Sequence, residues 1–281
     1  MKVSVIIPTY NEENVIRECL DSLAKQTYKE IEVIVVDDGS TDKTFKVLSD
    51  LRFKKYDLRV LKQEHKGPGE ARNFGAKHAM GEILVFADSD MTFDKDFINW
   101  LVEPIINGKA KGTWSRDEYV SNSENVWSQC WGINEGWEKG KRHPKNYPQT
   151  QKVFRAILKS EFDRVGGFSK GGFYTDDWTL SEKLRYEATV APNAKFYHKN
   201  PETLGEVFSQ AKWVAKRPYK LGIMGMTIAL ARSSLPFSLV VGFFKSIIHA
   251  KPGFLIFKLV YDFGVFVGIL EYLLLGKGIK S

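Results

Sequence analysis

The first ninety residues alternate short apolar runs with segments whose apolar residues recur at helical spacing. The runs are "VSVIIP" (3–8), "IEVIVVD" (31–37), "LRVLKQ" (58–63) and "EILVFAD" (82–88). Apolar runs of this length between polar segments predict buried strands. The intervening segments 12–26, 40–51 and 69–80 predict helices. Because strand and helix alternate with short links, the pattern indicates an α/β fold, a parallel sheet with helices on both faces.

The rest of the chain follows a less regular pattern. A strand is expected at "KVFRAIL" (152–158), a helix at 175–185, and two short strands within 188–198. Beyond about residue 200 come two long apolar stretches, 221–250 and 254–276, which predict a C-terminal apolar helical hairpin. The sequence therefore divides into a domain over 1–200 and a helical region over 201–281.

The charge distribution separates the same two regions. The net charge of +7 arises after residue 198, where eleven Lys and Arg stand against four Asp and Glu; thirty of each sign remain in 1–198. Basic residues mixed with apolar stretches favour an anionic membrane surface as partner. No nucleic-acid-binding motif is present, so we expect no nucleic acid partner.

Two cysteines, Cys19 and Cys130, provide no disulfide framework and indicate a reducing compartment. Met1 and Lys2 lead directly into the first strand, so no signal peptide is expected. Together with the basic apolar tail, this predicts the cytoplasmic face of the cell membrane.

Polar side chains follow each of the first four predicted strands. They are Thr9 to Asn11, Asp37 to Ser40, Glu64 to Lys66 with Arg72 nearby, and Asp88 to Asp90. In parallel sheets the ligand crevice lies beyond the carboxyl ends of the strands. Four polar clusters at one edge therefore predict a binding site there.

The pair Asp88 and Asp90 forms a D-x-D arrangement at the end of the fourth strand. Two carboxylates on one side of a strand repel each other unless a cation lies between them. Mg²⁺ accepts one or two carboxylates and completes its shell with water and phosphate oxygens. A divalent metal with a diphosphate ligand accounts for the pair.

Several motifs occur together with D-x-D in a fixed order. They are "PTYNEE" (8–13), "VDDGSTD" (36–42), "GPGEARNFGAKHAMGEILVFADSD" (67–90), "GGF" (166–168) and "TDDW" (175–178). In order and spacing they resemble the family 2 glycosyltransferases of GT-A fold, over residues 3 to about 200. The resemblance implies a Rossmann-like mixed sheet flanked by helices, with a nucleotide-binding half (1–110) and an acceptor half (111–200). It also implies inverting transfer of one sugar from a nucleotide-diphosphate donor with Mg²⁺ or Mn²⁺.

The resemblance also assigns roles to individual residues. Donor-binding residues are expected to be Pro8, Thr9, Tyr10, Glu12, Asp38, Lys66, Arg72, Asp88 and Ser89, and metal ligands Asp90, Asp88 and His198. Asp177 matches the family's base, with Asp176 beside it, and Arg155 matches an arginine near acceptor or phosphate. Alternative roles stay open for four of these residues. Asp176 could cap a helix, and Lys66 could be a solvated loop lysine. Tyr10 could lie at the rim of the site, and His198 could be structural.

The processive members of the family carry Q-x-x-R-W after the base. Here "SQAKW" (209–213) has Ser209 and Lys212 at the Gln and Arg positions. This departure favours a single transfer. The acceptor is expected to be a glycan or a polyprenyl-linked sugar. Two rival functions are a sugar-phosphate nucleotidyltransferase and a sugar-binding scaffold without catalysis.

Neither C-terminal apolar stretch is free of charge over about twenty residues. A hairpin in the membrane interface, a tilted span and a buried contact in a homo-oligomer all fit the pattern. Lys258 and Asp262 are four residues apart and are expected to pair.

Overall fold

The computed structural model describes residues 1–50, 57–169, 176–216, 219 and 221–275. The chain forms two compact units, unit 1 with residues 1–119 and 146–198 and unit 2 with residues 120–145 and 199–281. The segment 120–145, which the sequence groups with the acceptor half, is thus part of the unit that holds the C-terminal helices.

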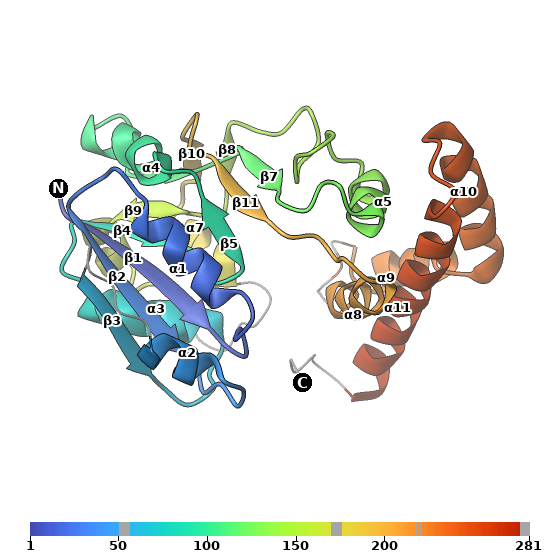
Figure 1. Ribbon diagram of the computed structural model, residues 1–281, viewed down its shortest axis with the longest axis horizontal. Coiled ribbons are helices and arrows are strands. Elements are labelled where there is room, and N and C mark those ends of the chain that lie inside the picture. The colour runs from blue at the N-terminus through green and yellow to red at the C-terminus, as the bar shows by residue number, and fades with distance from the viewer. Residues whose placement is uncertain (51–56, 170–175, 217–218, 220, 276–281) are drawn as a thin grey trace. The chain divides into compact units, whose positions relative to one another are not determined.

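The main sheet of unit 1 has eight strands in the order β3-β2-β1-β4-β9-β6-β10-β8. Its first four strands in sequence are β1 (Val3–Thr9), β2 (Ile31–Asp37), β3 (Asp57–Lys62) and β4 (Ile83–Phe86). They are mutually parallel, as the sequence predicts, and their register brings Thr9, Asp37 and Lys62 level at one edge (Figure 1). The predicted convergence of strand ends is therefore confirmed.

The remaining strands make the sheet mixed. They are β6 (Gly112–Trp114), β8 (Thr150–Gln151), β9 (Ala156–Leu158) and β10 (Ala188–Val190). Strand β9 runs antiparallel between β4 and β6, and β10 is parallel to β6. The strand expected over 152–158 begins only at Ala156. A second sheet has the order β5-β11-β7, with β5 (Met91–Phe93), β7 (Glu118–Val120) and β11 (Phe196–His198).

Helices cover both faces of the main sheet, because β1 directs alternate apolar side chains to either side. The helices of unit 1 are α1 (Ile16–Ala24), α2 (Thr44–Asp50), α3 (Pro68–His78), α4 (Phe97–Ile106), α6 (Lys159–Arg164) and α7 (Asp176–Leu184). Val5 and Ile7 join the core cluster that includes residues of α1 and α4, and Ile6 joins the one that includes residues of α3. Helix α3 packs so closely that a Cβ on Gly75 would lie 2.6 Å from Ile6 Cγ2.

The edge of the sheet away from the candidate site contains a buried charge, Glu32 of β2. Ser4 Oγ and the Met80 N–H donate to its carboxylate at 2.5 and 2.6 Å, and Arg59 pairs with it. Burial alone would raise the pKa of Glu32, yet these donors and cations lower it. A buried strand can therefore contain this acidic residue, because residues that are close in the fold provide hydrogen bonds and an ion pair to its carboxylate.

The described part of unit 2 is built mainly of helices and includes the end of β7. Its helices are α5 (Val126–Glu135), α8 (Leu204–Val214), α9 (Gly222–Arg232), α10 (Leu235–Ile248) and α11 (Phe254–Leu275). Its core joins Cys130 and Trp131 of α5 to Val207, Phe254 and Phe257. Helix α11 approaches α8 through Gly268, where a Cβ would lie 2.3 Å from Lys212 O.

The first C-terminal apolar stretch is two helices rather than one arm of a simple hairpin. Helices α9 and α10 meet at a 66° bend around Ser233 and Ser234. Pro236 lies in the first turn of α10, where a proline without an N–H is tolerated, whereas within a continuous helix it would remove a hydrogen bond. The predicted pair of Lys258 and Asp262 forms at 2.7 Å and is buried, and Ser238 Oγ donates to the same carboxylate.

Candidate donor-binding site

The loops after β1 and β2 are joined by side-chain hydrogen bonds. Asn11, with a positive φ of 57°, accepts from the Thr41 N–H at 2.8 Å, and its own N–H donates to Ser40 Oγ. The Glu12 N–H donates to Thr44 Oγ1 at 2.7 Å, and Glu13 accepts from the Lys43 N–H. The motifs "PTYNEE" and "VDDGSTD" therefore build one rigid rim of the site.

An aromatic pair lies on this rim. The Tyr10 ring stacks on His65, with ring centroids 4.0 Å apart and planes 25° from parallel. His65 Nδ1 in turn lies 2.9 Å from a carboxylate oxygen of Asp38. Tyr10 was expected to stack on a nucleobase, and the structure shows that its ring already stacks on a flat neighbour.

The carboxylate of Asp38 is almost fully buried, and polar groups of the same chain occupy its hydrogen-bond acceptor positions. Gln63 Nε2 and the N–H groups of Lys66 and Gly67 donate to it at 2.6, 2.9 and 2.8 Å, in addition to the His65 contact. A carboxylate offers about four lone-pair positions, so these four partners occupy them. In this structure Asp38 fixes the β3–α3 loop, and a direct bond to a base would require one of these donors to leave.

A three-residue ion cluster lies at the end of β4. Arg72 Nη2 is 2.8 Å from Asp88 Oδ1, and Arg155 Nη1 is 2.9 Å from Asp88 Oδ2. Burial alone would raise the pKa of Asp88, but the Arg155 and Arg72 guanidiniums hold it well below its usual range. The cluster has one carboxylate and two guanidiniums, so it carries one excess positive charge.

The second aspartate of the D-x-D pair has a different environment. The Asp90 side chain is 42% exposed, and its Oδ2 lies 2.8 Å from His198 Nε2. The other ring nitrogen of His198 lies 3.1 Å from Glu118 Oε1. The two aspartates thus separate, Asp88 toward the arginines and Asp90 toward the histidine.

The donor set at Asp90 fits a divalent cation. A carboxylate oxygen and an imidazole nitrogen are both metal ligands, and a histidine ligand commonly bonds a carboxylate through its second nitrogen, as His198 does with Glu118. Within the described residues no group of three or more His, Cys, Asp or Glu is arranged to hold a metal by itself. Asp90 and His198 would therefore hold a cation only together with ligand oxygens and water.

The other predicted site residues lie around this edge. Pro8 and Thr9 end β1, Ser89 is buried, and Lys66 is exposed on the β3–α3 loop. The Thr9 hydroxyl is buried and has no hydrogen-bond partner among the described residues. Asp176 and Asp177 form the start of helix α7; their side chains fall outside the described part of the chain.

Sequence reasoning gave no role to His65 or Glu118. His65 follows β3 at the predicted edge, so its position was a usable signal. Glu118 stands in a short polar strand 80 residues from His198, and no local pattern indicates their contact.

A mixed sheet with this strand order and a D-x-D pair at the end of β4 is the GT-A fold, the class of domain that this site defines. The family model "Glycosyl transferase family 2" matches residues 4–169. The chain belongs to glycosyltransferase family 2.

Two relatives that match in sequence are much longer proteins. Over 103 residues the chain is 48% identical to "Poly(ribitol-phosphate) beta-N-acetylglucosaminyltransferase TarS" of Staphylococcus aureus, covering 35% of this chain and 17% of that protein. Over 111 residues it is 41% identical to "Glycosyltransferase GlyA" of Streptococcus pneumoniae, covering 39% and 16%. The matched segments thus span about a sixth of these relatives.

Solved structures share the fold over nearly the whole chain. S. aureus TarS 1-349 in complex with UDP-GlcNAc aligns with a TM-score of 0.57 and 20% identity, covering 100% of this chain and 93% of that one. Mannosyltransferase PcManGT from Pyrobaculum calidifontis, in complex with GDP-Man and Mn²⁺, aligns with a TM-score of 0.60 and 20% identity, covering 98% and 88%.

Proposed function

We propose that this protein is an inverting, metal-dependent glycosyltransferase that moves one sugar from a nucleoside-diphosphate sugar to a glycan or lipid-linked acceptor. The observation that carries the proposal is the Arg72–Asp88–Arg155 cluster. Its excess positive charge lies at the same edge of the sheet as the Tyr10 stack and the Asp90–His198 pair. A donor has an aromatic base, a diphosphate and metal-binding oxygens, and this edge offers a partner for each.

In this proposal each group of site residues binds a different part of the donor. Tyr10 and His65 present aromatic faces to the base, while Asp38 keeps the β3–α3 loop in place. Arg72 and Arg155 bind diphosphate oxygens, and guanidiniums are suited to this because they donate in pairs. Asp90 and His198 would hold the cation, which stabilises the negative charge that builds up on the leaving diphosphate.

Inversion requires attack by the acceptor hydroxyl on the anomeric carbon from the side opposite the diphosphate. The proton of that hydroxyl passes to a base during the displacement. Asp177, at the start of α7, is our candidate for this base, with Asp176 as the second choice. The C1–diphosphate bond breaks as the C1–acceptor bond forms, so no co-reactant is needed.

The names of two relatives suggest a class of acceptor. TarS of S. aureus and "Poly(ribitol-phosphate) beta-glucosyltransferase" of Bacillus spizizenii, 44% identical over 94 residues, are both named for a polyol-phosphate polymer. We include such polymers among the glycan acceptors and retain a polyprenyl-linked sugar as the alternative, because unit 2 is strongly apolar.

The proposal is tested with a panel of nucleotide-sugars in a thermal-shift and hydrolysis assay with Mg²⁺ or Mn²⁺. A true donor at a hundredfold excess over its Kd should stabilise the fold by about 2.7 kcal/mol. Slow, metal-dependent release of nucleoside diphosphate should accompany it. Nucleotidyltransfer would instead release pyrophosphate from a nucleoside triphosphate, and a scaffold would bind without releasing product; either result contradicts the proposal.

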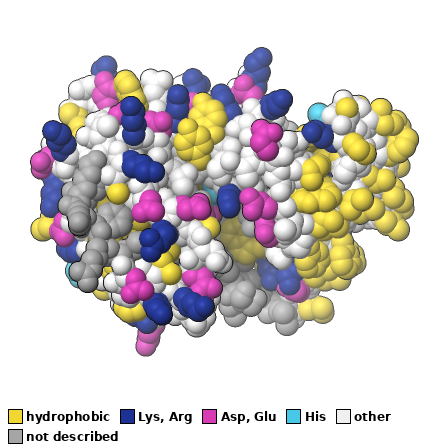
Figure 2. All heavy atoms as spheres, viewed as in Figure 1, with side chains coloured by type: hydrophobic (Ala, Val, Ile, Leu, Met, Phe, Trp, Pro, Cys, Tyr) yellow, Lys and Arg dark blue, Asp and Glu magenta, His cyan; other side chains and the backbone are white. Residues whose placement is uncertain are grey.

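We further propose that unit 2 docks the enzyme on the cytoplasmic face of a membrane. Its helices α9 to α11 expose large apolar side chains, among them Ile223, Phe243, Phe244, Ile247, Ile248 and Leu274. Figure 2 shows hydrophobic side chains gathered over this part of the molecule. No single described helix is long and apolar enough to cross a bilayer; α9 and α10 reach that length and composition only as a bent pair.

The charges of unit 2 favour an anionic lipid surface over a second copy of the chain as partner. Arg232 is exposed at the end of α9, whereas the acidic residues of α11, Asp262 and Glu271, are paired with lysines. Each basic residue near an anionic surface contributes about 1 kcal/mol, and apolar burial adds to it.

Replacing Phe243, Phe244 and Ile247 by serine should abolish flotation of the full-length protein with anionic liposomes. The three side chains lie on one face of α10 and are 55–61% exposed, so the unit-2 core should be preserved. Phe45→Ser, a 41%-exposed aromatic of α2, is the matched control and should float normally. If the triple variant floats like the parent, or sediments as a smaller oligomer, this face is not the membrane contact.

A further inference from the structure

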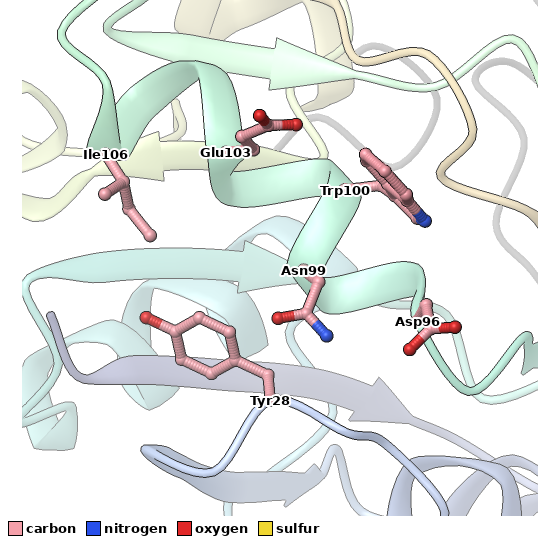
Figure 3. A pocket seen from close by; sticks show the side chains of 6 residues that line it. All are labelled: Tyr28, Asp96, Asn99, Trp100, Glu103 and Ile106. Atoms are coloured by element: carbon pink, nitrogen blue, oxygen red, sulfur yellow. The ribbon is translucent and has the colours of Figure 1, made fainter.

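A surface hollow of about 490 Å³ lies beside helix α4, well away from the candidate donor site. Tyr28, on the α1–β2 connection, lines it together with residues of one helical stripe: Asp96, Asn99, Trp100, Glu103 and Ile106. Figure 3 shows the Tyr28 ring below the helix, with Asn99 and Ile106 directed toward it.

The position of the hollow separates it from the donor edge. The Tyr28 hydroxyl donates to the Met1 carbonyl, which precedes β1, so Tyr28 lies at the start of the parallel strands. The donor residues lie at their carboxyl ends. Strand β2 has seven residues, so the two edges are roughly 20 Å apart. A ligand in the hollow would not touch the reacting atoms.

The exposed stripe of α4 is unusual for a solvent-facing helix surface. The face of this helix that packs into the core consists of Phe97, Ile98, Leu101, Val102 and Ile105. On the opposite side Trp100 and Ile106 are nevertheless 40% and 43% exposed. Because the Trp100 ring is partly exposed to solvent, it provides a flat apolar surface for a ligand.

The polar groups beside Trp100 are hydrogen-bond acceptors. Asp96 accepts from the Thr27 hydroxyl at 2.5 Å, and Asn99 Nδ2 donates to the same hydroxyl oxygen, which directs its amide. The Glu103 carboxylate is exposed and makes no ion pair or side-chain hydrogen bond with any other described residue. The pKa of Tyr28 is raised, first by burial and then by the nearby carboxylates of Glu30 and Glu82.

We propose that this hollow is a second, non-catalytic carbohydrate-binding site for neutral pyranose chains. A pyranose has an apolar C–H face that packs on an indole ring, and its hydroxyls donate to carboxylate and amide oxygens. Two carboxylates oppose anionic polymers, so polyol phosphates are excluded from this site. The site would hold a glycan chain on the enzyme at a distance from the reaction, which raises the local concentration of its ends.

The proposal is independent of the donor chemistry and is tested on the full-length protein in mild detergent. Depletion isotherms are measured on insoluble cellulose and on chitin, whose chains are neutral pyranoses. Trp100→Ala should weaken binding to at least one of them about tenfold or more, since truncation of a central tryptophan removes much of a contact. Trp100→Phe keeps an aromatic face and should remain within a few-fold of the parent. Phe45→Ala, an equally exposed aromatic elsewhere in unit 1, should bind like the parent.

Three results overturn the proposal. These are absence of parental binding to both polymers, equal binding by Trp100→Ala, and a change from dimer to monomer on Trp100→Ala, which would make this face a contact between copies of the chain. Nucleoside-diphosphate binding, followed by thermal shift on the same variants, reports the donor site separately. A parent that binds glycan but no nucleotide would contradict the proposed function and leave this site standing.

Discussion

Replacement of Asp177 by asparagine is expected to reduce glycosyl transfer by 10²–10⁴-fold, the usual contribution of a general base. The amide keeps the shape of the side chain but cannot take a proton from the acceptor hydroxyl. Donor affinity should stay nearly unchanged, because the base acts on the acceptor and not on the diphosphate. The measurement is single-turnover transfer together with nucleotide binding on the same preparation.

Asp176→Asn is the matched control for this experiment. Both residues begin helix α7, so both substitutions remove one negative charge from the same helix N-terminus, where carboxylates are favourable. A loss of stability common to the two variants therefore reports the helix, and a loss of rate specific to Asp177 reports the base. Transfer by Asp177→Asn within a few-fold of the parent would contradict the assignment, and a large loss in Asp176→Asn would move the role there.

The fold of unit 1 is predictable where local pattern and topology agree. Strands β1, β2 and β4 are mostly apolar because both of their faces are buried, and short βα links leave one arrangement for the strand ends. The sequence alone therefore predicts that Thr9, Asp38 and Asp88 lie at one edge of the sheet. The short strands β6 to β10 have two or three residues each, too few for an apolar period to define them.

The pairing of side chains within the site is much less predictable. Arg155 reaches Asp88 across 67 positions and His198 reaches Asp90 across 108, and no local spacing encodes such contacts. The D-x-D spacing indicated that Asp88 and Asp90 share one side of a strand. The chain bends at their position, since β4 ends at Phe86 and the Met91 N–H bonds back to the Asp88 carbonyl. The two carboxylates consequently have separate partners.

The grouping of residues 120–145 with the C-terminal helices shows the same limit. Trp131 of α5 lies in the segment 111–200 that the sequence assigns to the acceptor half, yet its ring packs edge-on against Phe257 and Tyr261 of α11. The presence of a hydrophobic residue in the sequence does not indicate which distant helix its side chain packs against. Only the assembled core of Cys130, Trp131, Phe254 and Phe257 defines this unit.

The separate environments of the two aspartates lead to the second large effect. Asp90→Ala is expected to abolish Mn²⁺-dependent strengthening of nucleoside-diphosphate binding, because it removes the carboxylate that lies 2.8 Å from His198 Nε2. The side chain is 42% exposed and contributes little to the core, so the fold should persist. Affinity is measured by titration with the diphosphate in the presence of Mn²⁺ and again in the presence of a chelator.

Glu118→Gln provides a graded control for the same titration. Glu118 bonds the far nitrogen of His198 and would orient it without touching the cation. Loss of such a supporting partner typically weakens metal binding by about 10–100-fold, less than loss of a ligand. The expected order of Mn²⁺ affinity is therefore parent, then Glu118→Gln, then Asp90→Ala, while affinity in chelator is the same for all three. Equal Mn²⁺ dependence in the parent and in Asp90→Ala would show that the cation is held elsewhere. In that case the role of Asp90 would be reduced to orienting His198.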